Sequence, residues 1–159
     1  MPQPKTNAMR LLEQAHVPYE VLSYAYDEED LSGVTAARHL GVDPEIVFKT
    51  LVLRGARHPI LLALLPVERT LDMKKLAVLC GEKRVEPVHV KELLPLTGYM
   101  RGGCSPIGMK KSFPVYADSC LTRHPQVLVN AGKRGLQLKI NPQDLIAFCQ
   151  ITVGDISTK

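Results

Sequence analysis

Lys49 is the first residue whose type and position suggest chemistry. It lies in residues 47–52, VFKTLV, where strand alternation places its side chain on the same face as Val47 and Leu51. A lysine on an apolar face is costly unless a polar or anionic group binds it. The pattern therefore predicts that Lys49 meets a substrate. An exposed edge at the start of the strand is the alternative.

A glycine-rich loop over residues 98–111, GYMRGGCSPIGMKK, is the second candidate. Glycine lets the backbone take positive φ and approach another group closely, so Gly102 and Gly103 could present N–H groups to a phosphate or a carbonyl oxygen. The two lysines that end the loop would add positive charge. A plain turn would use the same residues, so the loop alone leaves both interpretations open.

The third candidate is residues 129–135, VNAGKRG, where a strand ends in a glycine-flanked turn that contains Lys133 and Arg134. Loops of this kind supply oriented amides without side-chain bulk, which suits the stabilisation of a developing oxyanion. An ordinary hairpin turn explains this segment equally simply when it is considered alone.

The cysteines and histidines exclude several kinds of site. The four cysteines lie far apart, with no CxxC pair and no Cys/His pair at metal-ligand spacing, so no zinc site, redox dithiol or cofactor is expected. The five histidines lie away from the three segments, so no acid–base triad is predicted. Cys104 leaves one alternative open, because a thiol between glycine and serine and upstream of lysines could have a lowered pKa and act as a nucleophile.

The elements that must position these segments mix helices and strands without strict alternation. The expected class is α+β, with a mixed, mostly antiparallel sheet, a central hairpin formed by the two longest apolar runs, and helices packed on the sheet. Apolar periodicity predicts helices over residues 8–15, 34–40, 73–80, 88–96 and 142–149, with Thr6 or Asn7 capping the first and Gly41 and Gly81 ending the second and third. Strands are predicted over residues 19–26, 47–55, 58–66, 113–118, 126–132 and 136–140.

Length and composition indicate one globular domain over residues 1–159. Apolar residues make up 45% and charged residues 23%, and no apolar run reaches the ~20 residues of a membrane helix, so no membrane contact is predicted. The first 16 residues carry charges where a secretory signal would be apolar, which favours the cytoplasm. The net charge of +4 suits a polyanionic partner.

The segments FKT, GYMRGGCSPIG and VNAGKRG resemble, in order and spacing, the signature segments of the YbaK/EbsC family. That family contains bacterial Cys-tRNA(Pro) deacylases and is related to the editing domain inserted in prolyl-tRNA synthetase. The resemblance covers nearly the whole chain, from residue 8 to the final helix. It implies a mixed sheet closed into a partial barrel, and a crevice that binds the aminoacylated 3′ adenosine of tRNA.

The resemblance also implies roles for individual residues. Lys49 and Gly102 would be catalytic, with Lys49 beside the ester or terminal phosphate and Gly102 close to the substrate backbone. The thiol of the substrate's own cysteine would attack its ester carbonyl, so the protein mainly orients and polarises the ester. The implied partners are the acceptor end of aminoacyl-tRNA and prolyl-tRNA synthetase. The implied substrate-binding residues are Tyr24, Thr50, Gly103, Ser105, Asn130, Gly132, Lys133 and Arg134.

The chain departs from the family pattern at the amino-acid pocket. Asn130 and Ala131 stand where better-known members have serine and glycine, and Gln137 stands where they have aspartate. Pocket residues set amino-acid specificity. A deacylase that acts on another aminoacyl-tRNA, and a non-catalytic module that binds the tRNA 3′ end or a nucleotide, are therefore alternatives to Cys-tRNA(Pro) hydrolysis.

Overall fold

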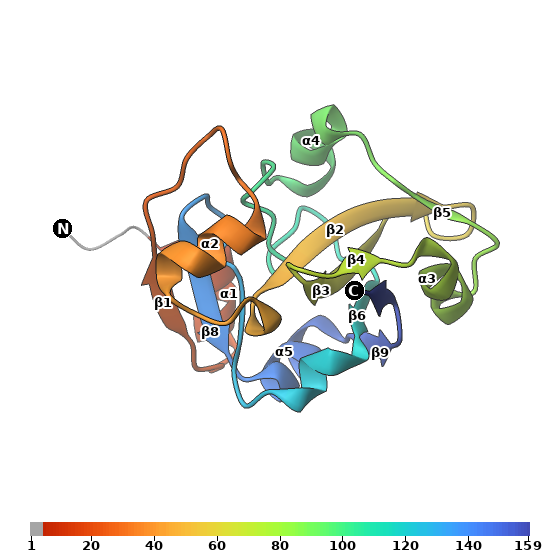
Figure 1. Ribbon diagram of the computed structural model, residues 1–159. Helices are drawn as coiled ribbons and strands as arrows, with labels where there is room; N and C mark the ends of the chain where they lie inside the picture. The colour runs from red at the N-terminus through yellow and green to blue at the C-terminus, as the bar shows by residue number, and fades with distance from the viewer. Residues whose placement is uncertain (1–4) are drawn as a thin grey trace.

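The computed structural model describes residues 5–159, so the first four residues of the charged N-terminal segment lie outside the described part. Helices pack around three β-sheets, which have five, three and two strands (Figure 1). The α-helices are α1 (Asn7–Gln14), α2 (Gly33–Leu40), α3 (Met73–Cys80), α4 (Leu93–Thr97) and α5 (Pro142–Cys149). The strands are β1 (Glu20–Ser23), β2 (Phe48–Gly55), β3 (Leu61–Pro66), β4 (Thr70–Leu71), β5 (Val85–Pro87), β6 (Val115–Asp118), β7 (Val127–Asn130), β8 (Leu136–Ile140), β9 (Thr152–Gly154) and β10 (Ser157–Thr158).

The largest sheet has five strands in the order β5-β2-β3-β6-β9. Its β2–β3 and β2–β5 pairs are antiparallel, whereas β3–β6 and β6–β9 are parallel. A three-stranded sheet, β1-β8-β7, is antiparallel throughout, and a parallel bridge between Val47 and Leu128 joins it to the five-stranded sheet. Strands β4 and β10 pair antiparallel as a separate two-stranded sheet. The result is compatible with a partial barrel, and no closed barrel forms within residues 5–159.

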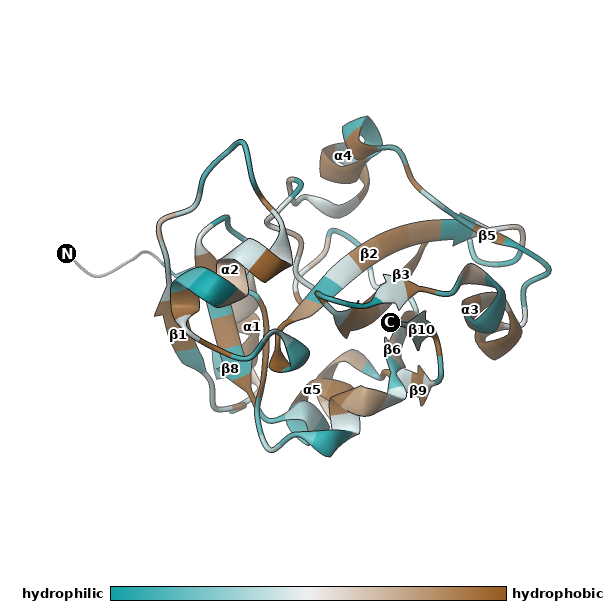
Figure 2. Cartoon of the chain, viewed as in Figure 1, coloured by the Kyte–Doolittle hydropathy of each residue, from teal (hydrophilic) through white to brown (hydrophobic). Residues whose placement is uncertain are grey.

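The β2–β3 hairpin lies at the centre of the core. Every residue of β3 is buried, because one face of the strand packs with Leu12 of α1 and the other with Leu76 of α3. A strand covered on both faces needs no polar alternation, which explains its unbroken apolar run. The middle of β2 is apolar in the same way and is brown in Figure 2.

Several helices begin and end at the residues that the sequence indicates. The side chain of Thr6 accepts a hydrogen bond from the Met9 amide at the start of α1. Helices α2 and α3 both end at glycines in the left-handed conformation, Gly41 and Gly81, with φ of +68° and +74°. None of the helices between residues 5 and 159 is long and apolar enough to cross a membrane.

The fold class and the central hairpin are confirmed, but some predicted boundaries are wrong. The strand predicted over residues 19–26 is limited to β1, and the helix predicted over residues 88–96 is a 3₁₀ turn, Val90–Glu92, followed by the short α4. Strands β4, β5, β9 and β10 were not predicted. Each contains only two or three residues and is too short to show a period, so its pairing partner defines it.

Candidate active site

A cavity of about 550 Å³ is lined by residues of the five-stranded sheet, the three-stranded sheet and the glycine-rich loop. Strand β2 forms its floor, and the ends of β7 and β8 contribute polar side chains. It is lined by Tyr24, residues 29–33, Ala36, residues 47–53, Val67, residues 87, 88, 90 and 93, Arg101, Gly102, Cys104, Asn130 and Gln137. Segments distant in the sequence therefore converge on one volume, which is large enough for a nucleoside-sized ligand.

Lys49 presents the only lysine side chain among these lining residues. Its Nζ donates to the carbonyl oxygen of Arg69 at 2.8 Å and lies 3.5 Å from that of Val67. Within residues 5–159 no carboxylate lies at ion-pair distance from it. Burial lowers the pKa of Lys49 from its ordinary value. The site therefore holds a partly desolvated cation whose partners are neutral, and this cation can stabilise negative charge on a ligand.

The glycine-rich loop approaches the cavity at two adjacent glycines. Gly102 has a φ of +81°, and a Cβ on it would lie 3.2 Å from Leu31. A Cβ on Gly103 would lie 3.2 Å from the backbone nitrogen of Arg134, so the loop packs directly on the turn after β7. The amides of Gly102 and Cys104 donate to no other described residue, which leaves them available to an oxyanion or a phosphate.

Asn130 links the glycine-rich loop to the turn after β7. Its Nδ2 donates to the Gly102 carbonyl at 3.0 Å, while its Oδ1 accepts from the amides of Gly132 at 2.6 Å and Lys133 at 3.0 Å. The side chain is buried, so these three bonds are made in a low-dielectric setting where they are strong. Asn130 consequently fixes the position of Gly102 at the cavity wall.

Two polar atoms at the cavity have no partner. Thr50 Oγ1 and Gln137 Oε1 are buried and make no hydrogen bond with residues 5–159. Gln137 is only 6% exposed and pairs with Asn130 across β7 and β8. A buried polar atom without a partner typically costs about 1–3 kcal/mol. Both side chains line the cavity, so a ligand bound there can supply the missing partners.

No nucleophile–base pair is present among the residues that line the cavity in the described chain. None of them is a histidine, and burial raises the pKa of the Cys104 thiol to about 11. Cys104 is therefore protonated near neutral pH and a poor nucleophile. Asp30 is engaged in hydrogen bonds from Thr35 and Ser32 at the start of α2. Within residues 5–159 no group of three metal-ligating side chains occurs.

Five of the predicted site residues line the cavity, namely Tyr24, Lys49, Thr50, Gly102 and Asn130. The other five do not line it, namely Gly103, Ser105, Gly132, Lys133 and Arg134.

Ser105 and Gly132 stabilise the loops behind the cavity wall. Ser105 is fully buried, and its Oγ accepts from the Ile107 amide at 3.2 Å. Gly132 has a φ of +100°, and a Cβ on it would lie 2.8 Å from the Tyr99 ring. Lys133 is exposed, and Arg134 donates to the Arg101 carbonyl at 2.9 Å. The backbone of both residues lies against Gly103, next to the lining residue Gly102.

Sequence reasoning missed several lining residues. Val67 and the start of α2 meet so closely that a Cβ on Gly33 would lie 2.1 Å from Val67 Cγ1. A serine cap followed by glycine at the start of a helix was the available signal for Gly33. Arg101 was visible as a cation inside the glycine-rich loop. Val67 has no such signal, because its place depends on the packing of β3 against α2.

Residues 29–148 match the family of aminoacyl-tRNA editing domains. The chain belongs to this family, and the resemblance to the YbaK/EbsC group seen in its sequence motifs is confirmed.

Individual relatives agree with this family. The chain is 43% identical over 157 residues to a protein of Enterococcus faecalis named "Putative Cys-tRNA(Pro)/Cys-tRNA(Cys) deacylase EbsC", and the match covers 99% of this chain and 96% of that protein. The fold is similar to that of the hypothetical protein APE2540, with a TM-score of 0.87 at 21% identity over 96% of this chain and 100% of that one. It is also similar to "a putative trans-editing enzyme for prolyl tRNA synthetase", with a TM-score of 0.82 at 24% identity over 99% and 100% of the two chains.

Proposed function

We propose that this protein is a trans-editing enzyme that hydrolyses the ester of Cys-tRNA(Pro), and also that of Cys-tRNA(Cys). The observation that carries the proposal is the cavity itself, which combines Lys49 and the Gly102 amide with no nucleophile–base pair. Such a site suits a reaction in which the substrate brings its own nucleophile. The chain's membership of the editing-domain family and its 43% identity to EbsC support the same reaction.

In this reaction the thiol of the bound cysteine attacks its own ester carbonyl. The new S–C bond forms as the C–O bond to the ribose breaks, and the thiol proton passes to the leaving ribose oxygen. Water then opens the cysteine thiolactone to give free cysteine. Lys49 and the amides of Gly102 and Cys104 stabilise the negative charge on the carbonyl oxygen, and Tyr24 and Thr50 orient the terminal adenosine.

The rim of the cavity receives the acceptor end of the tRNA. In this proposal Lys133 and Arg134, whose backbone packs against Gly103, bind phosphates of the single-stranded end. A cavity of about 550 Å³ holds one aminoacylated nucleoside and therefore reads nothing of the anticodon. Prolyl-tRNA synthetase is the partner that would supply selection of tRNA(Pro), and both proteins would act in the cytoplasm.

The test is hydrolysis of Cys-, Ser-, Ala- and Pro-tRNA(Pro) and of Cys-tRNA(Cys), with and without prolyl-tRNA synthetase. Cys-tRNA(Pro) should be cleaved far faster than Ser-tRNA(Pro), because the two differ only in a thiol and a less nucleophilic hydroxyl. The variant Cys104→Ser should keep near-normal rates. Equal rates on the cysteine and serine substrates, together with loss of activity in Cys104→Ser, would replace substrate-assisted chemistry with a protein thiol.

A second candidate is a deacylase with another amino-acid preference. The unpaired Oε1 of Gln137 at the cavity favours it, because a buried amide selects hydrogen-bonding groups that differ from those a carboxylate would select. Faster hydrolysis of Ala-tRNA(Pro) than of Cys-tRNA(Pro) would establish this alternative. Binding of all these substrates without any hydrolysis would instead identify a non-catalytic module.

A further inference from the structure

The partners of Lys49 come from one short turn. Both carbonyl oxygens near its Nζ, those of Val67 and Arg69, belong to the turn that joins β3 to β4. This turn is closed by a hydrogen bond from the Arg69 amide to the Pro66 carbonyl at 3.0 Å. A lysine has a long flexible stem and about 2 kcal/mol of rotamer entropy to lose. The position of its ammonium group therefore depends on how firmly this turn is held.

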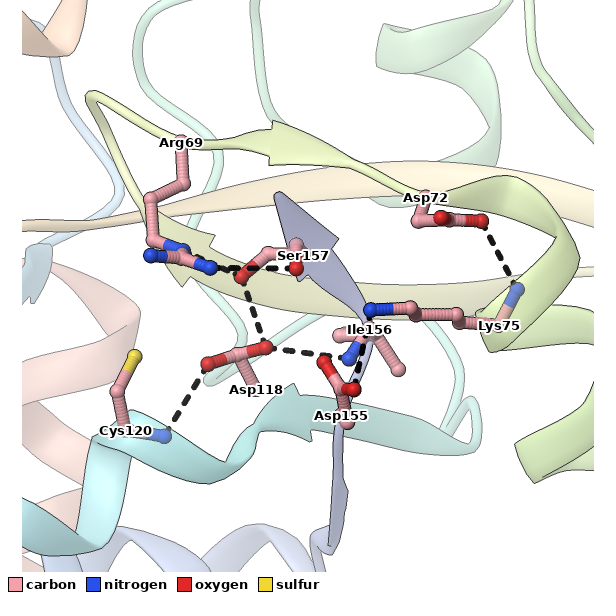
Figure 3. A network of polar contacts seen from close by, with 8 residues as sticks. All are labelled: Arg69, Asp72, Lys75, Asp118, Cys120, Asp155, Ile156 and Ser157. Atoms are coloured by element: carbon pink, nitrogen blue, oxygen red, sulfur yellow. Dashed lines mark hydrogen bonds and ion pairs between the residues drawn. The ribbon is translucent and has the colours of Figure 1, made fainter. Parts of the chain in front are cut away.

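The C-terminal strand contacts this turn through the side chain of Arg69 (Figure 3). The guanidinium group of Arg69 donates from Nε to Ser157 Oγ at 2.6 Å and from Nη2 to the Ser157 carbonyl at 3.2 Å. Strand β10, which contains Ser157, pairs with β4 directly after the turn. Arg69 thus uses its main chain for Lys49 and its side chain for the C-terminal segment.

A buried carboxylate completes the connection. Ser157 Oγ donates to Asp118 Oδ1 at 2.8 Å, and the amides of Ile156 and Cys120 each donate to the same carboxylate at 3.1 Å. Asp118 is 4% exposed and Ser157 is 2% exposed. The hydroxyl of Ser157 accepts from Arg69 and donates to Asp118, so it connects a cation to an anion through two charge-assisted hydrogen bonds.

We propose that Asp118, Ser157 and Arg69 are positioning residues for Lys49, so that the C-terminal strand is a functional part of the active site. The inference rests on the proposed function, since it assigns a support to the lysine of that site. Strand β10 lies beyond residues 29–148, which match the editing-domain family, so the family match does not include this support.

A double-mutant cycle tests the connection through single-turnover hydrolysis of Cys-tRNA(Pro). Ser157→Ala should lower the rate roughly 10- to 100-fold, the effect of displacing a catalytic group by a fraction of an ångström to about 1 Å. Ser157→Thr keeps the hydroxyl and should stay within a few-fold of wild type. In a Lys49→Ala background, Ser157→Ala should cause no further loss, because the group that it positions is gone. Independent, multiplicative losses would overturn the proposal.

Asp155→Ala is the matched control. Asp155 lies two residues before Ser157 and pairs with Lys75 at 3.0 Å, and it forms no hydrogen bond or ion pair with Arg69 (Figure 3). This variant should keep the wild-type rate. A loss of rate equal to that of Ser157→Ala would overturn the proposal, because it would show that any change that loosens the C-terminal segment lowers activity. If Ser157→Ala does not fold, Arg69→Lys serves instead, since it keeps the main-chain carbonyl and the charge but cannot bridge both Ser157 oxygens.

A measurement without substrate separates this inference from the proposed function. The ¹⁵N resonance of the Lys49 ammonium group, assigned by its loss in Lys49→Arg, should shift in Ser157→Ala and remain unchanged in Asp155→Ala. An unchanged resonance in Ser157→Ala would overturn the positioning role even in an active enzyme. Failure of the wild type to hydrolyse any aminoacyl-tRNA would overturn the proposed function, whereas the resonance would still report on the connection.

Discussion

Lys49 is a cation that the fold partly buries and pairs with main-chain carbonyls in place of a carboxylate. Carbonyl partners orient the ammonium group without neutralising it, so its full charge is available to an anion in the cavity. Thr50 Oγ1 and Gln137 Oε1, on residues that line the same cavity, have no hydrogen-bond partner within residues 5–159. The site therefore has polar groups that a bound ligand can satisfy.

We predict that Lys49→Ala lowers deacylation of Cys-tRNA(Pro) at least ~100-fold, since one preorganised donor at a reacting oxyanion is worth about 2.7–4 kcal/mol. The circular dichroism spectrum should be unchanged. Lys74→Ala, which removes an exposed lysine of α3, is the control and should have the wild-type rate. A Lys49→Ala enzyme within a few-fold of wild type would assign Lys49 a structural role only.

Thr50→Val should separate binding from stability. The change removes the unpaired Oγ1 and keeps the shape, so the free energy of unfolding should be unchanged or rise by about 1 kcal/mol. The KM for Cys-tRNA(Pro) should rise, because the ligand loses a hydrogen-bond partner. Urea unfolding and steady-state kinetics measure the two effects, and a clear loss of stability would show that Thr50 is already bonded in the free protein.

At the scale of elements, the glycine-rich loop and the turn after β7 act as one unit. Gly103 packs on Arg134, and Asn130 bonds both segments. Both segments lie outside helices and strands, so these contacts between them help to define their shape. The cavity wall that carries Gly102 is consequently defined by a contact between residues 28 positions apart in the sequence.

Asn130→Asp should loosen this unit selectively. The carboxylate can still accept from the amides of Gly132 and Lys133, but it cannot donate to the Gly102 carbonyl. Losing one hydrogen bond should lower the single-turnover rate about two- to tenfold. Asn141→Asp is the control, because Asn141 only caps α5, where aspartate caps equally well. A fully active Asn130→Asp enzyme would contradict the role of this bond.

At the scale of the whole molecule, the buried carboxylate of Asp118, at the end of β6, accepts hydrogen bonds from Ile156 and Ser157 of the C-terminal segment. Burial alone would raise the pKa of Asp118, but hydrogen bonds from Cys120, Ile156 and Ser157 outweigh it and hold the pKa below its ordinary value of 3.8. A carboxyl group whose pKa is lower in the folded state stabilises the fold above the unfolded pKa, and this stabilisation is lost as the pH falls through the folded pKa.

The expected result is an acid-sensitive contribution specific to Asp118. The free energy of unfolding of wild type should exceed that of Asp118→Asn near pH 6, and the difference should shrink as the pH falls below about 3.8, towards the lower folded pKa. Urea unfolding at a series of pH values measures both curves. A difference that stays constant down to pH 2 would mean that the carboxylate is not ionised in the native state.

The sequence by itself determined the elements whose signals are local. Two long apolar runs gave the β2–β3 hairpin, since only strands covered on both faces lack polar alternation, and Thr6, Gly41 and Gly81 marked helix ends through their own side chains or conformations. The three motif segments also indicated the family, because their residues recur in a fixed order. The cavity residues Lys49, Gly102 and Asn130 were recognised in this way.

Tertiary structure alone decided which motif residues face the cavity and what holds them. Ser105 belongs to the same motif as Gly102, yet its side chain is fully buried away from the lining, since the loop turns between them. The supports of Lys49 are main-chain carbonyls of Val67 and Arg69. Every residue has a carbonyl group, so such a partner leaves no trace in residue type, and only the packing of distant segments can specify it.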